Sequence, residues 1–293
     1  MRWVHIVEPT QKEIEELNKE FSFHPLVLKE LLLPTIRPKV DVYGSYFYMI
    51  LHMPIFDEKE RKTYPKEIDF LLLKDAVITI SYEAIEPLEE FWKLTEKRGQ
   101  DTSLENGTVH FLYHLIHHLF LFTLRELDHI QENINTLEDI IFYGKNEEIV
   151  HEMYLTRRDI IDFRRTIQPQ EMVLRSLEED GPTLYGASAE PFLRNLAGQY
   201  YRIRDVLEGH KETVRELYET HESIVNNRIN RTVKVFTVLA FLTFIPGLIA
   251  NFYGMNITQI PFSEHPYAFW LIASVAIGTS IAVFLYFKIR RIL

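Results

Sequence analysis

The chain has 293 residues and a formal net charge of −10, with 32 Lys and Arg against 42 Asp and Glu. This charge argues against a nucleic-acid partner, because proteins that bind nucleic acid carry basic patches. The absence of cysteine excludes disulfides, thiolate metal sites and cysteine nucleophiles. The acidic balance is compatible with ordinary solubility, and equally with a vestibule that gathers cations.

Residues 1–100 predict a small cytosolic α/β domain. A capping-box pattern over residues 10–13 begins one short helix. A second short helix follows Pro25, and its expected buried side consists of four leucines, Leu26, Leu28, Leu31 and Leu32. β-Branched and aromatic residues over 40–55 and 67–82 predict paired strands, with turns at Gly44-Ser45 and Lys74-Asp75. A helix that starts at Pro87 completes this domain.

Residues 101–188 predict two long antiparallel cytosolic helices. The first covers residues 104–142, the second covers 147–177, and residues 178–188 form the next break. From residue 189 no stop signal appears, so a cytosolic stalk over 189–232 should continue directly into the apolar C-terminal part. A helix of roughly 60 residues would be about 90 Å long. One small core cannot stabilise such a helix, so we expect it to pack against copies of itself.

Four histidines lie close together in the first long helix: His110, His114, His117 and His118. Their i, i+4 spacing places pairs on one helix face, as in some zinc sites. Leucines surround them, however, and no carboxylate falls within the cluster. We interpret them as structural histidines and keep a metal site as the alternative. We interpret the acidic residues that follow as a solvated helix face: Glu126, Asp128, Glu132, Glu138 and Asp139.

Two apolar runs, residues 236–252 and 267–287, are long enough to cross a bilayer, whose ~30 Å core needs about 20 helical residues. Basic residues lie before and after the pair but not within it. By the positive-inside tendency both ends face the cytoplasm, as in a multi-pass protein of the cell (inner) membrane. The expected parts are a first membrane helix over 233–256, an extracytoplasmic loop over 257–266, and a second membrane helix with a basic tail over 267–293.

One face of the first membrane helix is a candidate pore lining. Alternating intervals of four and three residues connect its members: Asn251, Gly247, Phe244, Ala240, Thr237, Val233 and Asn230. In a homo-oligomer, Phe244 or nearby Phe236 could form an apolar constriction that gates by dewetting. The alternative is a helix-packing face, because small residues mark helix contacts in membranes.

The first apolar run ends in Tyr253-Gly254-Met255-Asn256. This motif, at the end of the first of two C-terminal membrane helices, resembles the Gly-Met-Asn signature of the CorA family of divalent-cation channels. Residues 24–28 (HPLVL) and 37–43 (RPKVDVY) resemble an N-terminal segment of the same family. The resemblance therefore covers essentially the whole chain. It implies a funnel-shaped homo-oligomer, expected to be a homopentamer with the first membrane helix at its centre.

The resemblance implies that Gly254, Met255 and Asn256 form the outer selectivity filter. Mg²⁺ prefers oxygen ligands and loses water reluctantly, so a ring of Asn256 amides could bind its water shell and release it. The expected function is passive, potential-driven Mg²⁺ influx, with Co²⁺ or Ni²⁺ as further ions and no covalent cofactor. Signatures of phosphate loops, hydrolase elbows, zinc proteases and dinucleotide-binding folds do not occur, so we expect no enzyme.

Family members sense intracellular Mg²⁺ through carboxylates at subunit contacts. The counterpart position here is Asn195, where many relatives have Asp, and Glu83 and Glu86 are candidates for the partner side. Two other functions stay open: Zn²⁺ transport within the same fold, and a membrane-anchored sensor or scaffold that conducts nothing.

Overall fold

The computed structural model describes residues 1–97, 107–143, 146–255, 261 and 265–290. These residues form two compact units, 1–217 and 218–293. Helix α7, Glu190–Tyr253, passes from the first unit into the second without interruption, as the lack of stop signals predicts.

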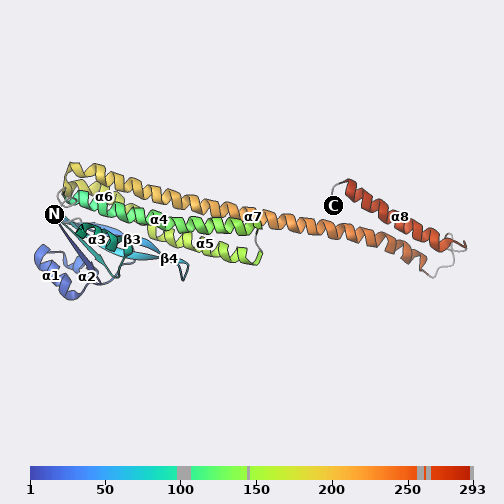
Figure 1. Cartoon of the computed structure of the whole chain (residues 1–293), viewed down its shortest axis with the longest axis horizontal. Helices are drawn as coiled ribbons and strands as arrows, with labels where there is room; N and C mark the ends of the chain where they lie inside the picture. The colour runs from blue at the N-terminus through green and yellow to red at the C-terminus, as the bar shows by residue number, and fades with distance from the viewer. Residues whose placement is uncertain (98–106, 144–145, 256–260, 262–264, 291–293) are drawn as a thin grey trace. The chain divides into compact units, whose positions relative to one another are not determined.

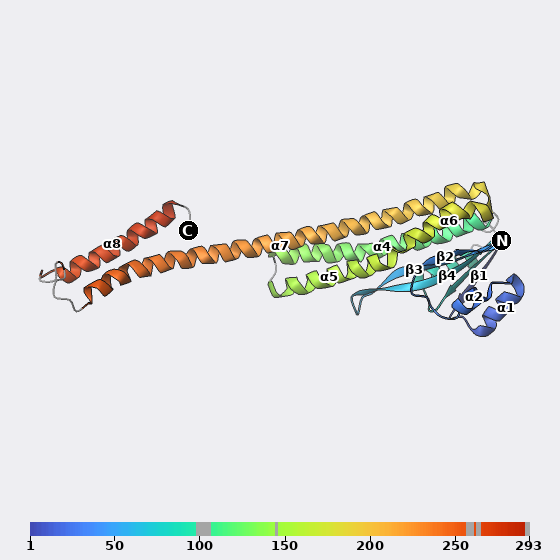
Figure 2. The ribbon, with the colours of Figure 1, turned by 180° about the vertical axis from the view of Figure 1, so that it is seen from behind.

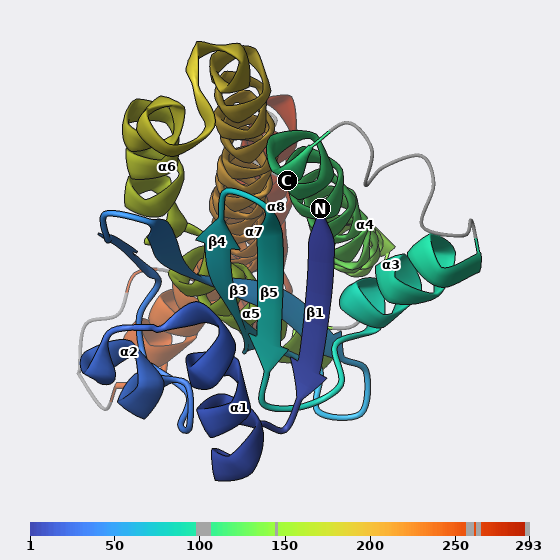
Figure 3. The ribbon, with the colours of Figure 1, turned by 90° about the vertical axis from the view of Figure 1, so that its left-hand side faces the viewer.

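The first unit contains a five-stranded sheet in the order β1-β5-β4-β3-β2 (Figure 3). Its strands are β1 (Arg2–Val7), β2 (Lys39–Val42), β3 (Tyr46–Asp57), β4 (Lys62–Leu73) and β5 (Ala76–Ser81). β1 pairs in parallel with β5, whereas all other neighbours are antiparallel. β1 was not predicted from the sequence, because this strand depends on a partner more than 70 residues away: Arg2 pairs with Ala76.

Both faces of the sheet are covered, which explains why β3 and β5 are almost continuously apolar. Successive residues of a strand point to opposite faces. In β3, Tyr48 and Ile50 belong to the cluster that packs against α1 (Gln11–Phe21) and α2 (Pro25–Glu30). The intervening residues face the long helices on the other side (Figure 3).

The two short helices agree with the sequence analysis except in one side chain. Thr10 and Glu13 form the predicted capping box, in which each side chain accepts a hydrogen bond from the other residue's backbone N–H. In α2, however, Val27 is 1% exposed and Leu26 is 60% exposed. The prediction that Leu26 is buried is wrong, because this helix of six residues turns Val27 and Leu31 toward the sheet.

The helical layer consists of α3 (Glu86–Lys97), α4 (Thr108–Tyr143), α5 (Asn146–Ile167) and α6 (Gln170–Tyr185), followed by α7. α4 and α5 lie side by side, and the first part of α7 runs along them (Figures 1 and 2). The predicted helix over 147–177 is wrong in extent. α5 ends at Ile167 beside Pro169, which has no N–H to donate, and α6 continues to Tyr185. The true break is at Gly186, whose φ of 86° favours glycine.

In the second unit, the last part of α7 pairs with α8 (Ala268–Ile289). Both helices are long and apolar enough to cross a membrane, and within the chain they bury at most 6% of their most apolar windows. Val238 of α7 is buried, and the rings of Phe241 and Phe287 lie 5.9 Å apart, centroid to centroid. Most of this apolar surface therefore needs lipid or another copy of the chain to cover it.

Candidate ion pathway and cytosolic metal sites

The predicted pore face is open in the single chain. Six of its seven residues are exposed and Gly247 is half-buried. The two phenylalanines considered as a constriction, Phe236 and Phe244, are 67% and 65% exposed. Each of these residues is therefore available to a pore, or to a neighbouring helix, outside this chain.

The opposite side of α7 is its buried side, and Phe241 next to it contacts Phe287 of α8. Val238 is 2% exposed, and Leu242, Ile245 and Ile249 are half-buried. These residues recur at intervals of four and three, and each lies two positions from a member of the predicted pore face. Two positions correspond to about 200° around a helix. Packing within the hairpin therefore leaves the predicted pore face unpartnered.

The polar groups on this face are few and neutral. The Thr237 hydroxyl donates to the Val233 carbonyl at 2.8 Å, so its oxygen remains free to accept a hydrogen bond from water. Asn230 and Asn251 place one exposed amide near each end of the face. Neutral oxygens can bind the hydration shell of a cation without holding the ion too tightly to release it.

The end of α7 indicates why the predicted filter begins with a glycine. The Gly254 N–H donates to the Ala250 carbonyl at 2.9 Å. A Cβ atom at Gly254 would lie 3.2 Å from that same carbonyl oxygen, which is tighter than most Cβ contacts in proteins. Met255 follows with 51% exposure. Asn256 and residues 257–260 lie outside the described residues, so the role of Asn256 stays a prediction.

The three regulatory candidates lie in separate environments in the single chain. Glu83 forms an ion pair with Lys66. Glu86 is the first residue of α3, where the helix dipole favours a carboxylate. Asn195 Oδ1 accepts hydrogen bonds from the Tyr113 hydroxyl at 3.1 Å and from Gln199 Nε2 at 2.6 Å. Within the described ranges, no three His, Asp or Glu side chains are grouped to hold a metal ion.

The four histidines of α4 separate into different environments. His117 Nδ1 lies 2.7 Å from Gln199 Oε1, and His118 Nε2 lies 3.7 Å from a carboxylate oxygen of Glu90 in α3. Burial lowers the pKa of His118. The structural interpretation therefore fits these two. His110 and His114 instead face each other, with their Nε2 atoms 3.3 Å apart.

One residue of the acidic face was misjudged. Glu126 accepts a hydrogen bond at 2.8 Å from the backbone N–H of Phe56 in β3, and burial raises its pKa. The prediction of a solvated side chain is wrong for Glu126, because α4 packs directly on the sheet there.

The sequence analysis also missed a buried polar group in β4. Asp69 accepts hydrogen bonds from the hydroxyls of Tyr48 and Tyr82, both at 3.0 Å. Burial and the nearby Glu67 raise the pKa of Asp69. Glu67 accepts from the Thr35 N–H at 2.6 Å and lies 3.4 Å from His52 Nε2. Two carboxylates at i, i+2, next to the apolar end of β4, were the available signal.

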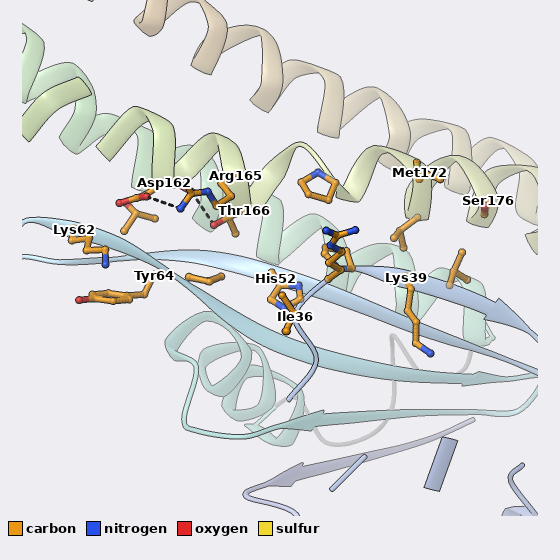
Figure 4. A pocket seen from close by; sticks show the side chains of 17 residues that line it. Ile36, Lys39, His52, Lys62, Tyr64, Asp162, Arg165, Thr166, Met172 and Ser176 are labelled. Carbon is orange, nitrogen blue, oxygen red and sulfur yellow. Dashed lines mark hydrogen bonds and ion pairs between the residues drawn. The ribbon is translucent and has the colours of Figure 1, made fainter. Parts of the chain in front are cut away.

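A cavity of about 910 Å³ lies between the β2–β4 side of the sheet and helices α5 and α6 (Figure 4). Its basic lining residues are Arg37, Lys39, Lys62 and Arg165. Asp162 is the single carboxylate among the residues that line it, and it lies 3.6 Å from Arg165. The positive balance of these side chains does not favour a cation in this cavity.

The fold and the two exposed apolar helices define an integral membrane protein with a large α/β body. The family model described as CorA-like Mg²⁺ transporter protein matches residues 1–290. The chain belongs to the CorA family.

Two relatives extend over nearly the whole chain. The cobalt/magnesium transport protein CorA of Thermotoga maritima is 25% identical over 99% of this chain and 82% of its own length. The CorA protein of Methanocaldococcus jannaschii is 20% identical over 97% and 88%. The complete structure of that magnesium transporter matches with a TM-score of 0.83, covering 98% of this chain and 89% of the other. Full-length CmaX matches with a TM-score of 0.70 at 18% identity, covering 99% and 88%.

Proposed function

We propose that this protein carries Mg²⁺, together with Co²⁺ or Ni²⁺, passively into the cell through a pore lined by α7. One observation supports this above the others: the face of α7 that leads to Gly254-Met255 is exposed, whereas Val238 on the opposite side is buried and nearby Phe241 contacts α8. The family supports the same function, because the relatives in Thermotoga maritima and Methanocaldococcus jannaschii are cobalt/magnesium transport proteins.

The pore requires several copies of the chain. A single exposed helix face cannot enclose a water-filled path, whereas a ring of such faces can. We propose a homopentamer with α7 at its centre and both termini in the cytoplasm. An inside-negative potential then draws ions inward, and contributes about 4.6 kcal/mol per 100 mV for a divalent ion. No other energy source is needed.

Selection takes place at Gly254, Met255 and Asn256. One Asn256 amide per subunit supplies neutral oxygens that bind hydrated Mg²⁺, and Gly254 lets the backbone turn there. Phe244 or Phe236 forms the apolar constriction further along the same face.

Regulation acts by population shift. Mg²⁺ bound between the cytosolic units of neighbouring subunits stabilises a closed ring. When this Mg²⁺ dissociates, the ring can open. Glu83 and Glu86 of one subunit and Asn195 of the next are the candidate ligands. Glu86→Gln should then weaken inhibition by Mg²⁺ on the cytosolic side. Unchanged inhibition in this variant would exclude Glu86 from the regulatory site.

The test is Mg²⁺ influx into proteoliposomes that contain a fluorescent indicator, under an imposed inside-negative potential. Influx that depends on potential in the wild type and is altered or lost in Asn256→Ala supports a channel filtered at this residue. Asn135→Ala, which removes an exposed amide of α4, is the matched control and should conduct normally. Influx of Zn²⁺ with a pH gradient but none of Mg²⁺ would replace the proposal with Zn²⁺ transport. No influx of either ion would indicate a sensor or scaffold.

A further inference from the structure

We propose that His110 and His114 form a binding site for Zn²⁺ or Co²⁺ on α4, separate from the Mg²⁺ pathway. The two side chains are one helical turn apart, and their Nε2 atoms lie 3.3 Å from each other. An i, i+4 pair of histidines on one helix is a known arrangement for binding zinc.

The distance between the two nitrogens fits a tetrahedral metal ion. Zn–N bonds are about 2.0–2.1 Å long, so nitrogens at this separation would subtend about 107° at the metal. The ideal tetrahedral angle is ~109°, and Zn²⁺ is almost always four-coordinate in such sites. A right angle, as in octahedral coordination, would bring the nitrogens to about 2.9 Å from each other. The separation of the two nitrogens is therefore that of two ligands of a tetrahedral ion.

Neighbouring aromatic rings hold the pair in place. The Phe192 ring of α7 lies 5.6 Å from the His110 ring, and the Tyr113 ring lies 5.3 Å from the His114 ring. Both histidines remain partly exposed, so an ion could reach them from solvent. Because metal-ligating geometry depends on such fixed orientations, the rings reduce the entropy lost on binding.

The chemistry of the site separates it from the Mg²⁺ pathway. Imidazole nitrogens suit Zn²⁺ and Co²⁺, whereas Mg²⁺ takes oxygen ligands in an octahedron. Among the residues that the structure describes, no third His, Asp or Glu side chain completes the site. Water can occupy the positions that the two histidines leave open, and binding should then be reversible.

The experiment is a Co²⁺ titration of the purified full-length protein, followed by visible absorption. Four-coordinate Co²⁺ absorbs strongly, whereas Co²⁺ bound by oxygen in an octahedron, as expected at the filter, absorbs weakly. We expect one strongly absorbing ion per chain, displaced by Zn²⁺ and unaffected by excess Mg²⁺. His110→Gln and His114→Gln should each weaken this binding by at least about tenfold.

His118→Gln is the matched control, because His118 lies on the same helix but faces Glu90 of α3. It should bind Co²⁺ as the wild type does. Circular dichroism establishes that each variant is folded. Weak absorption alone in the wild type would overturn the proposal and reduce the pair to an imidazole–imidazole hydrogen bond. Equal binding in the folded His110 and His114 variants would also overturn it. Neither readout depends on ion flux, so this test is independent of the transport assay.

Discussion

Phe241 of α7 and Phe287 of α8 lie with their ring centroids 5.9 Å apart, at an interplanar angle of 38°. The two residues come from opposite ends of the hairpin sequence: Phe241 is near the start of the first apolar run, and Phe287 is near the end of the second. Their contact therefore closes the hairpin at the end away from its connecting loop. It also fixes which face of α7 is turned toward α8.

A double-mutant cycle with Phe241→Ala and Phe287→Ala should reveal this contact. Aromatic pairs contribute about 0.5–1.5 kcal/mol beyond the area that they bury, so the two substitutions should be non-additive by about that amount. Unfolding of the purified protein in detergent provides the measurement. Phe241→Ala with Phe269→Ala, a ring near the other end of α8, is the control and should be additive. Additivity in both cycles would show that the ring contact contributes nothing.

Phe244→Ser should increase Mg²⁺ influx several-fold. The side chain is exposed on the face of α7 opposite α8, so a serine there would keep water in an apolar constriction. Influx into proteoliposomes is the measurement. Leu239→Ser is the control, because this exposed leucine lies outside the predicted pore face. An equal effect of both substitutions would mean that the face has no special role.

Gly181→Ala should destabilise the cytosolic unit by ~1–3 kcal/mol. A Cβ atom at this position of α6 would lie 2.3 Å from Cδ1 of Leu193 in α7, and Leu193 is 1% exposed with little room to move. The measurement is the change in Tm. Gly209→Ala in α7 meets nothing within 4 Å and should instead stabilise the helix by ~0.5–1 kcal/mol. A higher Tm for both variants would show that Leu193 adapts without cost.

Asp69 should make the protein less stable as pH rises. Burial, followed by Glu67, raises the pKa of Asp69 above its usual 3.8, so the folded state binds this proton more tightly than the unfolded state. Stability from this group is fully present below pH 3.8 and is lost as pH rises through the raised folded pKa. Asp69→Asn should remove this loss of stability, because the amide does not titrate. Its oxygen can still accept hydrogen bonds from Tyr48 and Tyr82. Tm measured against pH should show the variant gaining on the wild type as pH rises; parallel curves would contradict this.

Local signals predicted the parts of the fold that depend on neighbours in sequence. The capping box at Thr10, the turn at Gly44-Ser45 and the unbroken helix α7 each follow from a few adjacent residues. The period of the pore face is equally local. The position of α8 on the opposite side of α7 depends on tertiary contacts. The spacing of residues along α7 alone could not distinguish a pore-lining face from a helix-packing face.

The errors arose where distant contacts decide the outcome. A charged residue such as Glu126 is expected to be solvated. Its carboxylate instead accepts a hydrogen bond from the backbone N–H of Phe56, 70 positions earlier in the sequence. The helical spacing of apolar residues continues across Gln168 and Pro169, although the proline ends α5 there. The facing of His110 and His114 was predictable from spacing, whereas the 3.3 Å between their nitrogens depends on rotamers.

The parallel pairing of β1 with β5 sets an order of events during synthesis. β1 is the first strand of this sheet to be synthesised, yet its partner begins at Ala76, so it must wait for the other strands. β3, β4 and β5 can form consecutive antiparallel pairs as they appear, with short loops to close. The N-terminal strand then docks last at the open edge. A nascent chain arrested before residue 76 should therefore leave its first residues accessible to protease, long before either membrane helix has been made.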